Sequence, residues 1–119
     1  MRKKKVVTVV KDTPIEKVCR ILTRNNLSGV PVVDGKGGLA GFISERDIIA
    51  NFNAKCFSFK AKDIMKKNVI SIKEGTPPNI ASKIFAEKAF RHLPVLKKGK
   101  VVDVISRKDV IKKIVEHYY

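Results

Sequence analysis

The chain has 119 residues, 44% of them hydrophobic, which is enough for one compact unit with its own core and too few for two large domains. No apolar run reaches the roughly 18 residues that indicate a membrane span, and no cleavage site follows the basic start, so we expect a cytoplasmic protein with no membrane segment. Lys and Arg outnumber Asp and Glu by 26 to 11, and the formal net charge of +15 favours nucleic acid, anionic lipid or phosphorylated ligands as partners.

The first half of the chain predicts a strand, a helix, a hairpin and a second helix. β-branched residues over 6–9 indicate the strand, and Thr13-Pro14 suits a helix start, because proline at the first helical position gives up no needed N–H. Residues 29–33 and 39–43 predict two strands joined by a glycine-rich turn, and a helix follows them. The first helix is indicated by apolar residues that share one face: Ile15, Val18, Ile21 and Leu22.

The second half repeats this order. Residues 69–72 predict a strand, Thr76-Pro77 predicts a helix start, and residues 92–96 and 101–105 predict a second hairpin. The segment between the halves, residues 53–67, is expected to lie on the surface or to begin the second half. The closing helix is indicated by apolar residues at helical spacing: Val110, Ile111, Ile114, Val115 and Tyr118.

The two halves are copies of one unit, displaced by 63 residues before the hairpin turn and by 62 after it. A unit of about 60 residues buries too little surface to be comfortable alone, so we expect the copies, residues 1–57 and 58–119, to pack together about a pseudo-twofold axis. Such packing leaves two equivalent clefts between them. The matching residues are Thr13 and Thr76, Pro31 and Pro94, Ser44 and Ser106, and Asp47 and Asp109.

A Ser-x-x-Asp pattern, Ser44 to Asp47 and Ser106 to Asp109, follows a predicted strand and opens a predicted helix in both halves. One interpretation is a capping box, which satisfies the backbone donors of a helix start without any ligand. The other is a ligand site, since a helix start favours anions. Both can hold together.

The motifs together resemble the cystathionine β-synthase (CBS) domain family. The resemblance is carried by "SGVPVVD", "GFISERDII", "DIMKKNVISIKEGTP", "RHLPVL" and "DVISRKDVI", in family order and in two copies over nearly the whole chain. It implies an α/β fold of two tandem strand-helix-strand-strand-helix CBS repeats, packed as a pseudo-twofold Bateman module. It also implies a regulatory module, not an enzyme, that binds AMP, ADP, ATP or S-adenosylmethionine as a regulatory ligand, requires no cofactor, often forms a homodimer and signals to a partner protein.

The resemblance also implies the residues of two ligand sites. The strand-entry segments 65–70 and 2–7 match the backbone that lines the adenine. One site combines Asp47 with Val69 and Ile70, and the other combines Asp109 with Val6 and Val7. In such a site the aspartate accepts hydrogen bonds from the two hydroxyls of a ribose. Other positions are matched to ribose or phosphate contacts: Ser44, Ser106, Arg91 and His92, with Ser28 and Gly29 at the last two positions in the first copy. A phosphate tail would find further cations at Arg46 and Lys108. The chain departs from the family pattern where Asp103 replaces the glycine found at Gly41, and where the first copy lacks the "DIM" lead-in.

Nucleic-acid binding through the basic surface is the alternative function. Against it, the charge is spread over both halves, with 11 basic and 5 acidic residues in 1–59 and 15 and 6 in 60–119, and only 7% of residues are aromatic. No catalytic or metal site is predicted, because the candidate ligands lie far apart in the sequence: Cys19, Cys56, His92 and His117. The two cysteines are expected to be reduced thiols.

Overall fold

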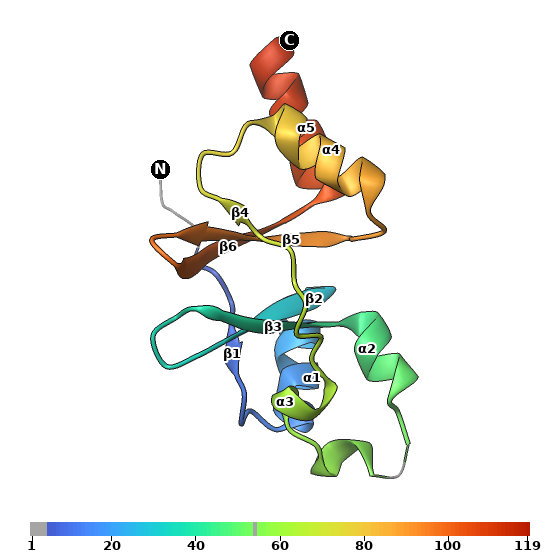
Figure 1. Cartoon of the computed structure of the whole chain (residues 1–119). Coiled ribbons are helices and arrows are strands. Elements are labelled where there is room, and N and C mark those ends of the chain that lie inside the picture. The colour runs from blue at the N-terminus through green and yellow to red at the C-terminus, as the bar shows by residue number, and fades with distance from the viewer. Residues whose placement is uncertain (1–4, 54) are drawn as a thin grey trace.

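The computed structural model describes residues 5–53 and 55–119, which form two three-stranded sheets with helices outside them (Figure 1). The first sheet has the strand order β1, β2, β3 and the second has the order β4, β5, β6. The strands are β1 (Val9–Val10), β2 (Gly29–Val33), β3 (Leu39–Ser44), β4 (Ile72–Lys73), β5 (His92–Lys97) and β6 (Lys100–Ser106). The helices are α1 (Ile15–Arg24), α2 (Glu45–Ala50), the 3-10 turn η1 (Cys56–Ser58), α3 (Ala61–Ile64), α4 (Pro78–Glu87) and α5 (Arg107–Tyr118).

Both sheets have the same internal pairing, so the repeat read from the sequence is confirmed in three dimensions. β1 runs parallel to β2 and β2 antiparallel to β3, and β4, β5 and β6 repeat this arrangement. Val9 pairs with Val32 in the first sheet and Ile72 pairs with Val95 in the second, which preserves the 63-residue offset on both strands.

The two short parallel strands begin later than the sequence predicts, at Val9 and at Ile72. The reason is visible in the second case, because residues 66–72 cross from one sheet to the other. Lys66 pairs with Phe42 in the first sheet, whereas Ile72 pairs with Val95 in the second. Only the end of each β-branched run therefore joins the sheet of its own repeat.

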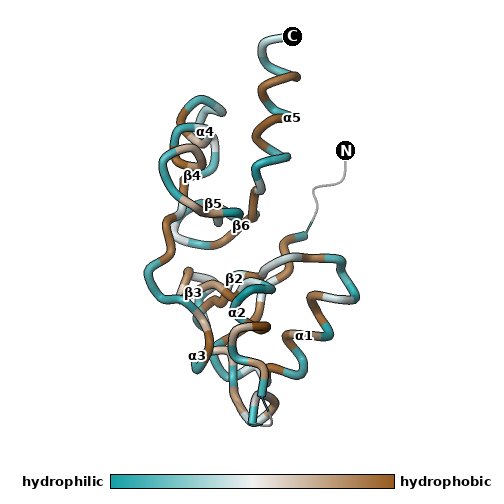
Figure 2. The backbone as a smooth tube through the Cα atoms, turned by 90° about the vertical axis from the view of Figure 1, so that its right-hand side faces the viewer, coloured by the Kyte–Doolittle hydropathy of each residue, from teal (hydrophilic) through white to brown (hydrophobic). Residues whose placement is uncertain are grey.

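The sheets lie one above the other in the middle of the molecule, with α4 and α5 on one outer side and α1, α2 and α3 on the other (Figure 1). The view turned by 90° shows the same layers, with hydrophobic and hydrophilic residues alternating along α1 and α5 (Figure 2). This alternation is what a helix packed on one side against a sheet requires. The α/β fold of two strand-helix-strand-strand-helix repeats is confirmed.

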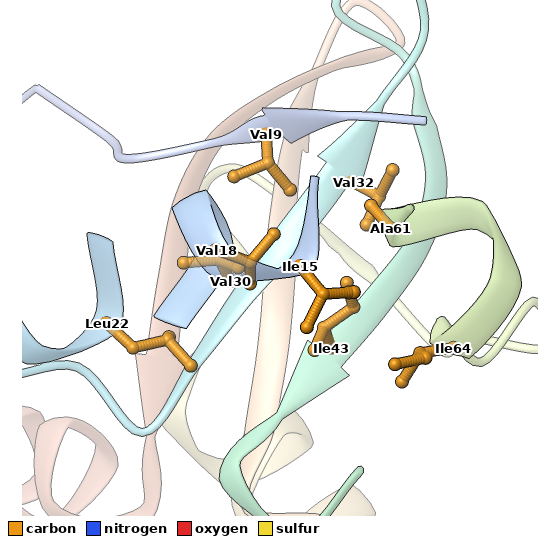
Figure 3. Packing of buried hydrophobic residues seen from close by; sticks show 9 residues of the cluster. All are labelled: Val9, Ile15, Val18, Leu22, Val30, Val32, Ile43, Ala61 and Ile64. Carbon is orange, nitrogen blue, oxygen red and sulfur yellow. The ribbon is translucent and has the colours of Figure 1, made fainter. Parts of the chain in front are cut away.

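The first repeat has a closed hydrophobic core beneath β1, β2 and β3 (Figure 3). The linking segment contributes to it, since Ala61 and Ile64 of α3 are 0% and 8% exposed. The Ala61 and Lys62 amides donate to the Thr13 and Lys11 carbonyls at 2.8 and 3.0 Å, which fixes α3 on the first repeat. The sequence predicts a segment that lies on the surface or begins the second repeat. Most of its described residues are exposed, but α3 packs against the first repeat. The domain boundary between residues 57 and 58 stays a prediction.

Candidate functional site

A cavity of about 500 Å³ opens where the two repeats meet, beside the start of α2. The first repeat supplies the end of β3 and the first turn of α2, the second supplies the residues just before β5, and the crossing segment forms the remaining wall. The described residues that line it are Ser28, Phe42, Ser44, Glu45, Arg46, Asp47, Ile49, Lys66, Asn68, Val69, Ile70, Ala89, Phe90, Arg91 and His92.

The start of α2 is held by a capping box, as the structural interpretation of Ser-x-x-Asp predicts. The Ser44 hydroxyl oxygen accepts from the Asp47 amide at 3.2 Å, and Oδ2 of Asp47 accepts from the Ser44 amide at 2.8 Å and from its hydroxyl at 2.9 Å. Asp47 is an acidic residue, yet it is buried, with only 8% of its surface exposed. Its position is therefore fixed before any ligand arrives.

The second carboxylate oxygen of Asp47 is left for other contacts. Oδ1 lies 3.7 Å from Nζ of Lys66, whose side chain is largely exposed. Oδ1 is thus oriented towards the cavity wall formed by the crossing segment. An oxygen in this position can accept hydrogen bonds from a hydroxylated ligand while Oδ2 keeps the helix capped.

The same capping box occurs at the start of α5, but its surroundings differ. Oδ2 of Asp109 accepts from the Ser106 amide at 2.7 Å and from the hydroxyl at 3.0 Å. Asp109 is exposed and lines a second cavity, of about 650 Å³, within the second repeat. The two Ser-x-x-Asp motifs therefore have equal local geometry and unequal environments.

His92 connects the repeats at the back of the first cavity. Its Nε2 lies 2.6 Å from the Ser28 hydroxyl oxygen, and its ring centroid is 5.1 Å from that of Phe42. Burial lowers the pKa of His92 and outweighs the opposing charge of Glu45, and the charge of Arg91 lowers the pKa slightly further. The imidazole is therefore neutral near pH 7, and the positive charge at this cavity comes from Arg46, Lys66 and Arg91.

Two glycines allow the close contacts behind this cavity. A Cβ on Gly29 would lie 2.5 Å from the Phe42 ring, and a Cβ on Gly41 would lie 2.6 Å from Sδ of Met65 and 2.9 Å from the Lys66 carbonyl oxygen. The absence of a side chain at Gly29 in β2 therefore leaves room for the Phe42 ring. Its absence at Gly41 lets the crossing segment approach β3. Phe42 and Lys66 exchange backbone hydrogen bonds of 3.0 and 2.9 Å there.

The structure gathers eight of the residues expected at the ligand sites around the first cavity: Ser28, Ser44, Arg46, Asp47, Val69, Ile70, Arg91 and His92. Gly29 lies in β2, Ser106 and Lys108 lie at the start of α5, and Val6 and Val7 precede β1, none of them in the described linings of the two cavities. The ligand contacts of all these residues stay predictions. Sequence reasoning did not assign Phe42 to the site, whereas Lys66 and Asn68 belong to the strand-entry segment 65–70 that the resemblance implies, and the crossing of this segment between the sheets brings them here.

Other kinds of site find no support in the part of the chain that is described. Residues 5–53 and 55–119 contain no group of three or more His, Cys, Asp or Glu side chains that could hold a metal ion. Within the same residues, no helix combines the length and the apolar character needed to cross a membrane.

Comparison with known proteins gives a consistent result. The model of the CBS domain family matches residues 1–53 and 61–116. An inosine-5'-monophosphate dehydrogenase of Aquifex aeolicus is 33% identical over 109 residues, which cover 90% of this chain and 22% of that enzyme. The chain thus spans about a fifth of the length of the dehydrogenases it matches.

Two solved structures share the whole fold. CBSX2 of Arabidopsis thaliana in complex with AMP has a TM-score of 0.84 at 22% identity, over 96% of this chain and 90% of that one. The CBS domain pair of MJ0100, in complex with 5'-methylthioadenosine and S-adenosyl-L-methionine, has a TM-score of 0.82 at 24% identity, over 98% of this chain and 92% of that one. The pseudo-twofold pair of repeats is confirmed by both.

Proposed function

The chain belongs to the CBS domain family, and from this premise we propose that it is a regulatory module that binds an adenosine-containing ligand in the first cavity and signals to a partner protein. The proposal is supported by the ligands of two proteins with the same fold, AMP in CBSX2 and 5'-methylthioadenosine with S-adenosyl-L-methionine in MJ0100. Because the chain matches only part of the dehydrogenases, their activity is not carried over. The absence of enzymatic activity, the homodimer and the cytoplasmic location stay predictions.

The observation that carries the proposal is that the two carboxylate oxygens of Asp47 have different surroundings. Oδ2 caps α2, whereas Oδ1 lies on the cavity side near Lys66. A ribose offers two adjacent hydroxyl donors, which one fixed carboxylate oxygen or its pair can accept. The apolar residues Val69, Ile70 and Phe90 line the same cavity and suit the faces of a purine.

The charges of the cavity favour a phosphorylated ligand. Three cations, Arg46, Lys66 and Arg91, line it together with two carboxylates, Glu45 and Asp47. If Asp47 binds ribose, the cations remain for a phosphate, and arginine can bind phosphate through two parallel hydrogen bonds. We therefore rank AMP, ADP and ATP above S-adenosylmethionine, which carries no phosphate.

The test is calorimetric titration of AMP, ADP, ATP and S-adenosylmethionine, with GMP as the base-specificity control. We expect the titration to show saturable binding. When the free ligand concentration is a hundred times the dissociation constant, the free energy of unfolding should rise by about 2.7 kcal/mol. Asp47→Asn keeps an acceptor for the cap and should weaken binding in the first cavity by about 1 to 3 kcal/mol.

Asp109→Asn is the matched control, because it makes the same change in a capping box outside the first cavity. It should leave the affinity of the first cavity unchanged. Loss of one of two binding steps in this variant would support the second predicted site, at Asp109 with Val6 and Val7. Equal binding by wild type and Asp47→Asn would refute the site assignment, and no binding of any adenosine ligand at low or moderate salt would refute the function.

A further inference from the structure

The second cavity is a groove within the second repeat, distinct from the proposed nucleotide site. One wall is the connection from β4 to α4, residues 72–78, and the other is one side of α5. The floor is apolar and consists of Ala81, Val95, Ile105 and Val110, and the α5 rim consists of Asp109, Lys113, Glu116 and His117.

The internal repeat shows what fills the equivalent place in the first half. There, Ala61 and Ile64 of α3 pack into the core against the strands and α1 (Figure 3). The residues around them have counterparts in the groove at offsets of 63 and 62. The pairs are Val9 and Ile72, Ile15 and Pro78, Val18 and Ala81, Val32 and Val95, and Ile43 and Ile105.

Among the described residues, no segment covers the core of the second repeat in the way that α3 covers the core of the first. The groove is therefore open. Ile15 and Ile43 are fully buried, whereas their counterparts Pro78 and Ile105 are half-buried. The groove is therefore lined by counterparts of the residues that hold α3 in the first repeat.

Two substitutions allow the second repeat to remain open without leaving backbone donors unpaired. The Ile15 amide donates to the Phe59 carbonyl at 3.0 Å, and Pro78 at the equivalent position has no N–H. The Asp103 carboxylate, at the position of Gly41, accepts from the Val104 amide at 2.8 Å. In the first repeat the equivalent amide pairs with the crossing segment. An open groove thus leaves no backbone donor unpaired at these two positions.

The charges indicate which kind of segment fits. In the first repeat, Nζ of Lys60 and Nζ of Lys62 lie 3.8 and 3.2 Å from Oδ1 of Asp12, at the edge of the region where α3 packs. In the second repeat Gly75 replaces Asp12, and three of the eleven acidic residues of this basic chain line the groove, with Lys73, Lys113 and His117 between them. The acids are Glu74, Asp109 and Glu116. Glu74 already lies 3.6 Å from Nζ of Lys97. Lysines flanking a short apolar segment would therefore be complementary to Asp109 and Glu116 on the α5 rim.

We propose that the groove of the second repeat is a docking site for a short basic segment of a partner protein. The segment has a small residue and, three positions later, an aliphatic residue, on the pattern of Ala61 and Ile64. Its amides donate to the carbonyls of residues 74–76, as those of Ala61 and Lys62 do to Lys11 and Thr13. This site does not depend on ligand binding in the first cavity.

The probe is a synthetic peptide with the sequence of residues 57–67, FSFKAKDIMKK, with blocked termini, titrated into the isotope-labelled full chain. We expect saturable NMR shifts at Ile72, Ala81 and Ile105, with a dissociation constant of about 1 mM or below. A peptide with Ile64→Asp loses the buried aliphatic contact and should bind at least about tenfold more weakly.

Two variants of the chain test the location. Ala81→Leu fills the floor of the groove and should abolish peptide binding, whereas Ala86→Leu, the same change at an exposed position of α4, should not. If Ala81→Leu fails to fold, Glu116→Lys on the exposed rim serves instead and should weaken binding by several-fold at low salt.

Three results would overturn the proposal. The first is the absence of saturable shifts at about 2 mM peptide. The second is a set of shifts confined to the first repeat, which would mean that the peptide displaces the chain's own α3. The third is the appearance of the groove shifts when protein alone is concentrated, because a second copy of the chain would then be the occupant.

Discussion

His92 is the residue whose protonation most directly links the two repeats, because it shares a hydrogen bond with Ser28 across them. Its pKa is lowered by burial, so the unfolded chain binds this proton more tightly than the folded chain does. The free energy of unfolding must then fall as the pH drops through the unfolded pKa of about 6.5, and must be independent of this group well above it.

The prediction is a pH slope that depends on His92. Between about pH 7.5 and 5.5, urea unfolding of wild type should show a loss of stability that is smaller in His92→Gln, which keeps a polar group near Ser28. His117→Gln is the control, because His117 is exposed on α5. Identical slopes in wild type and His92→Gln would show that this histidine does not couple folding to pH.

A nucleotide should reverse this coupling. A phosphate beside His92 favours the imidazolium, so binding would be accompanied by proton uptake and would tighten as the pH falls towards 6. Arg91 and Lys66 line the same cavity and would contribute to the affinity for a phosphate beside His92.

At the scale of the elements, the pairing of β3 with the crossing segment depends on Gly41. A methyl group there would meet Sδ of Met65 and the Lys66 carbonyl oxygen at 2.6 and 2.9 Å, and the carbonyl is part of the backbone and cannot turn away. Gly41→Ala should therefore lower the free energy of unfolding by about 1 to 3 kcal/mol. It should also weaken nucleotide binding, since Lys66 would shift.

Asp103→Ala is the matched comparison, because residue 103 is the counterpart of residue 41 and is exposed. It removes one acceptor from the Val104 amide and should cost about 1 kcal/mol or less, with no effect on the first cavity. Chemical denaturation of both variants measures the free energy of unfolding, and calorimetric titration measures nucleotide affinity. A Gly41→Ala variant as stable as wild type would mean that the crossing segment is not tightly held.

The elements themselves were predictable because their signals are local or repeated. α1 and α4 begin at Ile15 and Pro78, 63 residues apart, as the Thr-Pro pairs and apolar spacing indicate. The capping boxes at Ser44 and Ser106 were also predictable, since the pattern spans only four residues.

The position of α3 was not predictable in the same way. A helix of four residues, Ala61–Ile64, shows no periodicity, and its burial depends on contacts with residues about 50 positions earlier. The same holds for Lys66 and Phe42, which meet by pairing between distant segments. The eight clustered site residues and the strand-entry segment 65–70 followed from family motifs, whereas the pairing of Lys66 with Phe42 required the fold.

At the scale of the whole molecule, the two repeats are equal in topology and unequal in closure. The first has a core covered by α3, and the second has a groove in the corresponding place. Between them lies one well-formed cavity with residues from both. A ligand in that cavity would contact Arg91 and Asp47 together, and so would stabilise one arrangement of the repeats over others.

The net charge of +15 belongs to the whole molecule and separates the nucleotide proposal from nucleic-acid binding. If charge alone binds nucleic acid, affinity for a labelled single strand should fall about a thousandfold or more between 50 and 200 mM salt when six or more phosphates are contacted. AMP, which meets a few cations in a partly enclosed cavity, should lose far less over the same range. Asp47→Asn should weaken AMP and leave the strand unaffected. Fluorescence anisotropy measures the affinity for the strand, and calorimetry at the same salt concentration measures the affinity for AMP. Strand binding that persists at 200 mM salt and is competed by AMP would make nucleic acid the ligand of the same cavity.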